Sequence, residues 1–188
     1  RLKNDPSMPI NALQWCLEHA EVPAGGPDLI AYYDKPLLTM NRILRSFVDA
    51  GPKGFTSFPA AMTEWARNKL WTPYHVEQAI VDLGYAAPKD RMVFAEHHQS
   101  HAAAAFYPSP FESACILTFD GVGEWATASI GQGVGHRIDI LRELRFPASL
   151  GLLYSAFTQA AGFRVNSGEY KLMGLAPYGR PTRVDDIY

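Results

Sequence analysis

Between residues 114 and 146 the sequence repeats a pattern typical of β-strands joined by glycine-rich turns, and no other feature constrains the fold as strongly. Residues 114–119 form a continuous apolar run, residues 125–130 alternate in part and include β-branched side chains, and residues 137–146 alternate between apolar and charged side chains. Glycines occupy both connections, at positions 121 and 123 and again between 131 and 135. Three such segments with short turns predict an antiparallel β-meander.

Helical periodicity flanks this region on both sides. Apolar residues recur at steps of three and four between residues 10 and 20, and Ser7 is a candidate N-cap. Residues 36–85 show helical patterns in pieces, with a break at residues 51–54, which contain glycine and proline. Residues 149–162 form the last helical pattern. The sequence therefore predicts a helical insert over residues 36–85 and a further helix soon after the meander.

Two short apolar segments, residues 29–33 and 91–95, are predicted to be buried strands. The second leads into residues 96–105, where an alanine run favours a helix. Strands that alternate with helices beside an antiparallel meander indicate the α/β class, with parallel and antiparallel strands in one mixed sheet and helices flanking it. At 188 residues, the chain is expected to form a single domain.

The composition is that of a soluble globular protein, with 47% hydrophobic residues, 19% charged residues and a net charge of −2. This charge gives no electrostatic basis for binding nucleic acid or a membrane surface, and no apolar run approaches the roughly 18 residues of a membrane-spanning helix. Cys16 and Cys115 lie in apolar patterns and are predicted to be reduced core thiols of a cytoplasmic protein. Trp65, Trp71 and Tyr74 are predicted to lie in the core or an interface rather than in a cofactor site.

A cluster of histidines opens the helix predicted after the second short strand. His97 and His101 are four residues apart, so their imidazoles would point from one helix face and could bind one divalent metal ion. The alternative is a pair of surface or capping histidines. Residue 98 is a histidine rather than the glutamate that follows the first histidine in zinc proteases, which disfavours a metalloprotease.

The second candidate site is the loop at residues 120–124, which follows a predicted buried strand. Asp120 ends that strand, and Gly121 and Gly123 would let the backbone approach a phosphate closely while the carboxylate binds a metal ion. The alternative is a plain hairpin turn, in which Asp120 accepts a hydrogen bond from the backbone amide at position 122 or 123.

The third candidate lies in the glycine-punctuated residues 166–174. Lys171 stands there among apolar residues and could neutralise a phosphate or a carboxylate. A solvated loop that opens a short helix explains the pattern equally well. The two interpretations stay open from the residues alone.

Taken together, three segments in this order resemble one known family. Residues 96–102, 118–125 and 168–179, with residues 33–38 in addition, are similar to the nodulation-protein/antibiotic O-carbamoyltransferase family, which includes tobramycin carbamoyltransferase. The resemblance covers nearly the whole chain. It implies part of an N-terminal domain with the ATPase-type fold of the actin, sugar-kinase and Hsp70 superfamily.

In that family a C-terminal YrdC-like domain makes carbamoyl-adenylate from ATP and carbamoyl phosphate. The N-terminal domain then transfers the carbamoyl group to a hydroxyl of an acceptor, often a sugar. The resemblance thus implies three partners for the parent protein: ATP, carbamoyl phosphate and a hydroxylated small molecule such as a sugar or a natural product.

The resemblance also implies roles for individual residues. His97, His101 and Asp120 match the metal ligands, with iron the first expectation and manganese or zinc the alternatives. The residues expected to bind the nucleotide cofactor are Gly121, Gly123, Glu124, Gly151 and Lys171, although the resemblance leaves the role of Lys171 open.

The departures from the family pattern are omissions. The chain begins at Arg1, without a methionine, and the family's catalytic histidine is expected before that position. A further acidic metal ligand and the YrdC-like domain are expected beyond Tyr188. We therefore expect a fragment that is inactive alone, and self-association through an unpaired sheet edge is a hypothesis that follows. The alternative function is a non-catalytic metal- or nucleotide-binding module of an actin-like ATPase fold.

Overall fold

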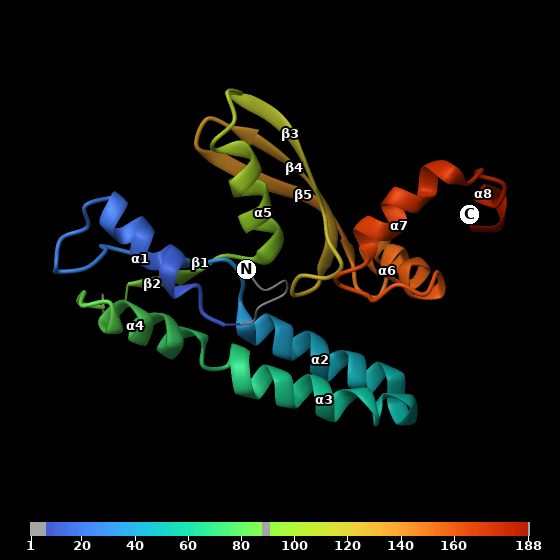
Figure 1. The fold of residues 1–188 in the computed structure, drawn as a ribbon, viewed down its shortest axis with the longest axis horizontal. Coiled ribbons are helices and arrows are strands. Elements are labelled where there is room, and N and C mark those ends of the chain that lie inside the picture. The colour runs from blue at the N-terminus through green and yellow to red at the C-terminus, as the bar shows by residue number, and fades with distance from the viewer. Residues whose placement is uncertain (1–6, 88–90, 188) are drawn as a thin grey trace.

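The computed structural model describes residues 7–87 and 91–187. A three-stranded sheet stands at the centre with a helix against it; a helical group with two short strands lies on one side and a second helical group on the other (Figure 1). Along the chain the elements are α1 (Ile10–His19), β1 (Ile30–Tyr32), α2 (Pro36–Ala50), the 3₁₀ turn η1 (Gly51–Gly54), α3 (Ser57–Glu64), the π-helical turn η2 (Trp65–Lys69), α4 (Thr72–Asp82), β2 (Met92–Phe94), α5 (His97–Phe106), β3 (Ser113–Phe119), β4 (Ala126–Val134), β5 (Arg137–Arg145), α6 (Leu150–Ala160), α7 (Glu169–Leu175), the 3₁₀ turn η3 (Ala176–Tyr178) and α8 (Val184–Ile187).

The two short strands pair with each other. β1 and β2 are parallel, with Ile30 opposite Met92 and Tyr32 opposite Phe94. A parallel pair needs a long crossover connection, and the helical segment α2–α4 supplies it. The fold is α/β as predicted. The expectation of one mixed sheet was wrong, because the parallel pair and the antiparallel meander form two separate sheets.

The predicted meander is confirmed: β3, β4 and β5 form an antiparallel sheet in that order. β4 runs on to Val134, although the glycines between residues 131 and 135 were expected to form the turn. Packing explains the difference. A Cβ on Gly133 would lie 2.7 Å from ring atoms of Phe106. The absence of a side chain at Gly133 therefore lets α5 pack closely against β4 at this point of the strand.

The core of the described residues lies between α5 and the sheet. Ala102 and Phe106, one turn apart on α5, pack on Ile116 of β3, and all three are buried. β3 alternates between buried and exposed side chains, and Phe119 is exposed. The apolar run at 114–119 therefore belongs to a strand covered on one face, as is usual in antiparallel sheets, whereas a buried strand was expected.

Several smaller expectations also need correction. Cys16 and Cys115 are free thiols, as predicted, but both are exposed rather than in the core. Trp65 is buried, whereas Trp71 and Tyr74 are more than half exposed. The N-cap position of α1 is occupied by Pro9 rather than Ser7, and no side chain caps that helix. Among residues 7–87 and 91–187, no helix combines the length and apolar character needed to span a membrane.

Candidate metal centre

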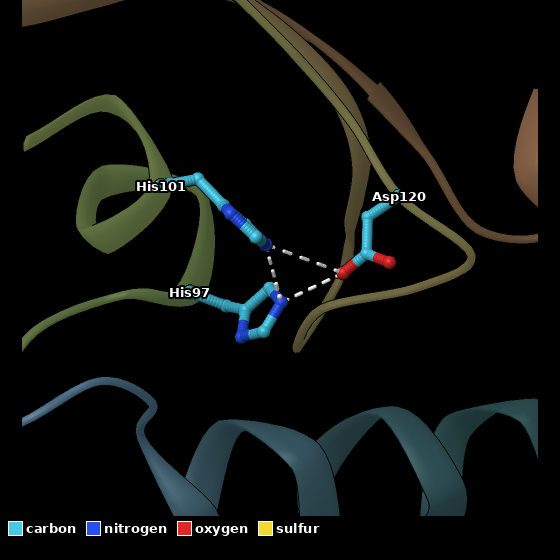
Figure 2. Close-up of side chains that lie close together, drawn as sticks. All are labelled: His97, His101 and Asp120. Carbon is cyan, nitrogen blue, oxygen red and sulfur yellow. Dashed lines mark hydrogen bonds and ion pairs between the residues drawn. The ribbon is translucent and has the colours of Figure 1, made fainter. Parts of the chain in front are cut away.

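Three of the predicted site residues converge on one point between α5 and the loop after β3 (Figure 2). His97 Nε2 lies 2.7 Å from Asp120 Oδ2 and 3.1 Å from His101 Nε2. His101 Nε2 lies 3.7 Å from the same carboxylate oxygen. Two imidazoles and one carboxylate therefore present three donor atoms to a common position.

Local structure explains why the two histidines meet there. α5 buries the face that carries His98, Ala102 and Phe106 against the sheet. His97 and His101 lie one turn apart on the adjacent face. The His101 side chain is 49% exposed, so the donor cluster opens to solvent on one side, while His97 is mostly covered at 19%.

Asp120 is the first residue after β3, and its two carboxylate oxygens have different partners. Oδ2 contacts His97, and Oδ1 accepts a hydrogen bond of 2.7 Å from the backbone amide of Gly121. The hydrogen bond with His97 lowers the pKa of Asp120 to about 2, and the same bond raises the pKa of His97. The turn-capping and ligand interpretations of Asp120 are therefore compatible, although the capped amide is that of Gly121 and not that of residue 122 or 123.

The two loop glycines do not present free amides in this structure. The amide of Gly121 donates to Asp120, and that of Gly123 donates to the carbonyl of Ala126 at 2.9 Å. A Cβ on Gly123 would lie 3.0 Å from His97 Cβ, so the absence of a side chain lets the loop rest against the first turn of α5.

Glu124 has partners other than the predicted phosphate. Its side chain is buried, and Oε1 accepts from the backbone amide of Lys35 at 2.8 Å. Both carboxylate oxygens lie 3.1 Å from the backbone nitrogen of His97. The contacts of Glu124 thus join the start of α2 to the start of α5.

Gly151 lies beside the metal-ligand loop, in the first turn of α6. A Cβ there would lie 2.4 Å from the carbonyl oxygen of Asp120. Ser149 Oγ caps α6 by accepting from Leu152 N at 3.0 Å and donates to the carbonyl of Gly121 at 2.6 Å.

Lys171, the remaining residue that was expected to bind the cofactor, is not part of this cluster. It is exposed on α7, which Figure 1 places well away from α5.

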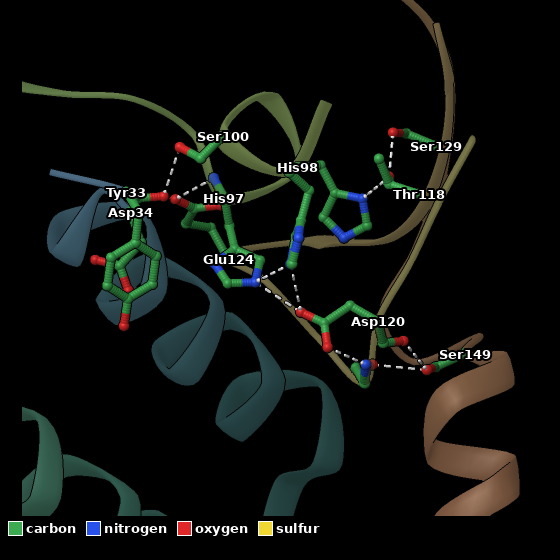
Figure 3. A network of polar contacts seen from close by, with 12 residues as sticks. Tyr33, Asp34, His97, His98, Ser100, Thr118, Asp120, Glu124, Ser129 and Ser149 are labelled. Atoms are coloured by element: carbon green, nitrogen blue, oxygen red, sulfur yellow. Dashed lines mark hydrogen bonds and ion pairs between the residues drawn. The ribbon is translucent and has the colours of Figure 1, made fainter. Parts of the chain in front are cut away.

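A buried polar chain behind the cluster was not predicted. His98 is 2% exposed, and its Nδ1 contacts Thr118 Oγ1, which in turn contacts Ser129 Oγ (Figure 3). Burial lowers the pKa of His98, which favours the neutral imidazole. The sequence gives only weak evidence for this chain, which is the presence of a hydroxyl residue in each of two adjacent predicted strands, Thr118 in the first and Ser129 in the second.

The aromatic residue beside the cluster was not predicted either. The ring of Tyr33 lies edge-on to that of His97, with 5.6 Å between the centroids, and Ser100 Oγ donates to the Tyr33 carbonyl at 2.9 Å. These contacts tie the end of β1 to α5 (Figure 3). The contacts of Tyr33 with His97 and Ser100 join segments far apart in the sequence, so no local sequence pattern predicts them.

The donor set fits a divalent cation. Imidazole nitrogens and carboxylate oxygens bind tetrahedral zinc at about 2.0–2.2 Å, which places neighbouring ligand atoms about 3.3–3.6 Å apart. The separations of 2.7, 3.1 and 3.7 Å bracket that spacing. A cation held by these three donors would keep positions open for other ligands.

Comparison with known proteins identifies the family. Residues 1–188, the whole chain, match the family described as "Carbamoyltransferase N-terminus". The chain belongs to this family. Along its full length it is 50% identical to an uncharacterized protein of Synechocystis sp. and 33% identical to nodulation protein NolNO of Sinorhizobium fredii.

The chain aligns with only part of each relative. The chain spans 31% of the Synechocystis protein and 26% of NolNO. Nodulation protein NolO of Bradyrhizobium diazoefficiens is 37% identical over 92 residues, which are 49% of this chain and 17% of that protein. The chain is thus about a quarter to a third as long as the relatives that it matches from end to end.

Proposed function

We propose that the full-length protein is a carbamoyltransferase and that this chain supplies residues that bind a divalent cation at its active centre. The observation that carries the proposal is the convergence of His97, His101 and Asp120 in a member of a family named for carbamoyl transfer. Iron is the first candidate by the family resemblance, and manganese and zinc are the alternatives, since nitrogen and oxygen donors discriminate poorly among these ions.

The proposed donor is carbamoyl phosphate, activated with ATP as carbamoyl-adenylate, and the acceptor is a hydroxyl of a sugar-like or natural-product molecule. In the transfer step the hydroxyl oxygen bonds to the carbamoyl carbon, the bond from that carbon to the adenylate phosphate oxygen breaks, and AMP leaves. The hydroxyl proton passes to a base. A bound cation would offset the charge that develops on the leaving phosphate.

The described residues serve this step by binding and orientation. His97 and His101 are fixed in mutual position by α5, and Asp120 is fixed by the end of β3 and by the Gly121 amide. Because these groups are held before ligands arrive, they need little reorganisation during transfer. We expect substrates to reach the cluster from the exposed side of His101.

The experiment uses the full-length protein with ATP, carbamoyl phosphate and a panel of hydroxylated metabolites, and detects carbamoylated products by mass spectrometry. His101→Ala should abolish transfer and cation binding. His136→Ala is the matched control, since His136 is exposed on the turn between β4 and β5, and it should keep both. Cation binding without any carbamoylated product would favour the non-catalytic binding module instead.

A further inference from the structure

We infer that Glu124 is a positioning residue that holds His97 and Asp120 at the spacing a cation requires. The inference rests on the proposed metal centre and assigns Glu124 a role through its contacts with the backbone. The resemblance had instead suggested that Glu124 faces a phosphate. The two roles lead to different measurements.

The location of Glu124 makes its carboxylate a tertiary helix cap. The first amides of a helix have no partner within the helix. The N-cap residue of α5 is Glu96 and that of α2 is Lys35. In both helices the side chain of the N-cap residue makes no capping hydrogen bond. The Glu124 carboxylate accepts from the amides of His97 and Lys35 in their place, where the positive ends of both helix dipoles favour a negative charge.

His97 is consequently held at two points by one short loop. Asp120, at the start of the loop, contacts its ring, and Glu124, at the end, contacts its backbone nitrogen (Figure 3). Gly123 packs against the same residue, with its ideal Cβ position 3.2 Å from His97 Cδ2. A change in the length or hydrogen bonding of residue 124 therefore alters the distance between two proposed ligands.

A carboxylate suits this place better than an amide. Its partners are backbone N–H groups, and both oxygens accept. A glutamine would turn an NH₂ group toward one of these donors. Residue 124 is only 4% exposed, so two N–H donors that face each other there would be costly. A buried polar group without a partner loses its hydration with no replacement.

The test compares Glu124→Gln, which keeps the side-chain length, with Glu124→Asp, which keeps the charge but shortens the reach. The full-length protein is titrated with Co²⁺ by calorimetry, and the absorption spectrum of bound Co²⁺ reports the ligand geometry. Both variants should weaken binding by about 10- to 100-fold, the usual effect of losing a group that orients a metal ligand. Both should also change the spectrum.

Glu96→Gln is the matched control. Glu96 precedes His97, and its side chain is 48% exposed in an ion pair with Lys35. Glu96→Gln therefore removes one charge from the same neighbourhood and leaves the contacts of Glu124 with the two amides in place. It should change Co²⁺ affinity less than about twofold, because exposed ion pairs contribute little. An equal effect of Glu96→Gln would overturn the inference, since the loss would then be one of charge alone.

The other outcomes are also decisive. Unchanged affinity and spectrum in Glu124→Gln overturn the inference and leave the proposed function standing. A wild-type protein that binds no Co²⁺ removes the proposed metal centre and the inference with it. If Glu124→Gln fails to fold, Glu124→Asp decides, because it keeps the charge but shortens the reach to the amides of Lys35 and His97: weaker binding with a changed spectrum supports the inference, and unchanged binding overturns it.

Discussion

In the loop after β3, Asp120 directs one carboxylate oxygen to His97 and the other to the amide of Gly121, and the two contacts can be separated by one substitution. Asp120→Asn keeps a carbonyl oxygen for the Gly121 amide but removes the charge that a cation requires. We expect a loss of stability below about 1 kcal/mol, because a partly exposed ion pair contributes little. Cation affinity should fall by about 100-fold or more, since even groups behind the ligands account for 10- to 100-fold.

Calorimetry with Co²⁺ and thermal unfolding followed by circular dichroism measure the two effects of Asp120→Asn. Transfer activity of the full-length variant should return in part with excess metal. Wild-type affinity in this variant would leave Asp120 with a turn-capping role alone.

The His97–Asp120 pair also predicts a pH dependence in the metal-free protein. The pKa of folded His97 lies above its ordinary 6.5, so the contribution of His97 to stability is complete below pH 6.5 and is lost as the pH rises through the raised value. The pKa of folded Asp120 is about 2 rather than 3.8, so its contribution is present above pH 3.8 and is lost as the pH falls toward 2. Together they stabilise most between pH 3.8 and 6.5.

Denaturant unfolding of the wild type and of Asp120→Asn between about pH 3 and pH 9 tests this pH dependence of stability. The difference between their free energies of unfolding should be largest near about pH 5 and smaller on both sides. A difference that is constant from about pH 3 to pH 9 would show that the pair does not stabilise the fold through its charges.

At the level of residues, the sequence sufficed where local geometry alone decides the contact. His97 and His101 share a face because they are one helical turn apart, and Asp120 projects from a strand end. The partners of Glu124 could not be predicted in this way, because they are backbone amides from two distant segments. Nothing in residue type or spacing reveals such a contact.

At the level of elements, the first turn of α6 packs on the loop that carries Asp120. Gly151→Ala would place a Cβ 2.4 Å from the Asp120 carbonyl, so the helix or the loop must move. Such overpacking typically costs about 1–3 kcal/mol. We expect lower stability and weaker cation binding together, because the displaced loop holds a proposed ligand.

Gly174→Ala is the control for this substitution. Gly174 lies inside α7, and apart from its chain neighbours and the backbone of its own helix no described atom lies within 4 Å of its Cβ position, so alanine should stabilise the helix by about 0.5–1 kcal/mol. Thermal unfolding should therefore shift in opposite directions for the two variants. A stabilised Gly151→Ala would contradict the close approach of α6 to the loop.

The elements were predicted best where the local signal was clear, which was strand alternation in the meander and the alanine run in α5. The end of β4 was misplaced because glycine is typical both of turns and of close packing, and the contact of Gly133 with the ring of Phe106 on α5 shows which applies. The single mixed sheet was inferred from alternating strands and helices, but sequence order does not reveal which strands pair.

At the scale of the whole molecule, the outer face of the antiparallel sheet carries a group of exposed apolar side chains on β3 and β4. Leu117 and Phe119 on β3 are 56% and 62% exposed, and Ile130 of β4, opposite Leu117, is 46% exposed. β3 is also an outer strand of its sheet. Apolar patches and open strand edges both favour association.

We therefore expect the 188-residue chain, expressed on its own, to self-associate as its concentration rises in sedimentation velocity experiments. Leu117→Lys should shift the distribution toward the monomer, because a lysine on an edge strand opposes both apolar contact and strand pairing. Leu29→Lys is the matched control: Leu29 is 55% exposed, almost the same as Leu117, but precedes β1 in the other sheet. A monomer at every concentration would contradict the prediction. An equal effect of the two lysines would assign the association to general hydrophobicity, whereas an effect of Leu117→Lys alone places it on the outer face of β3.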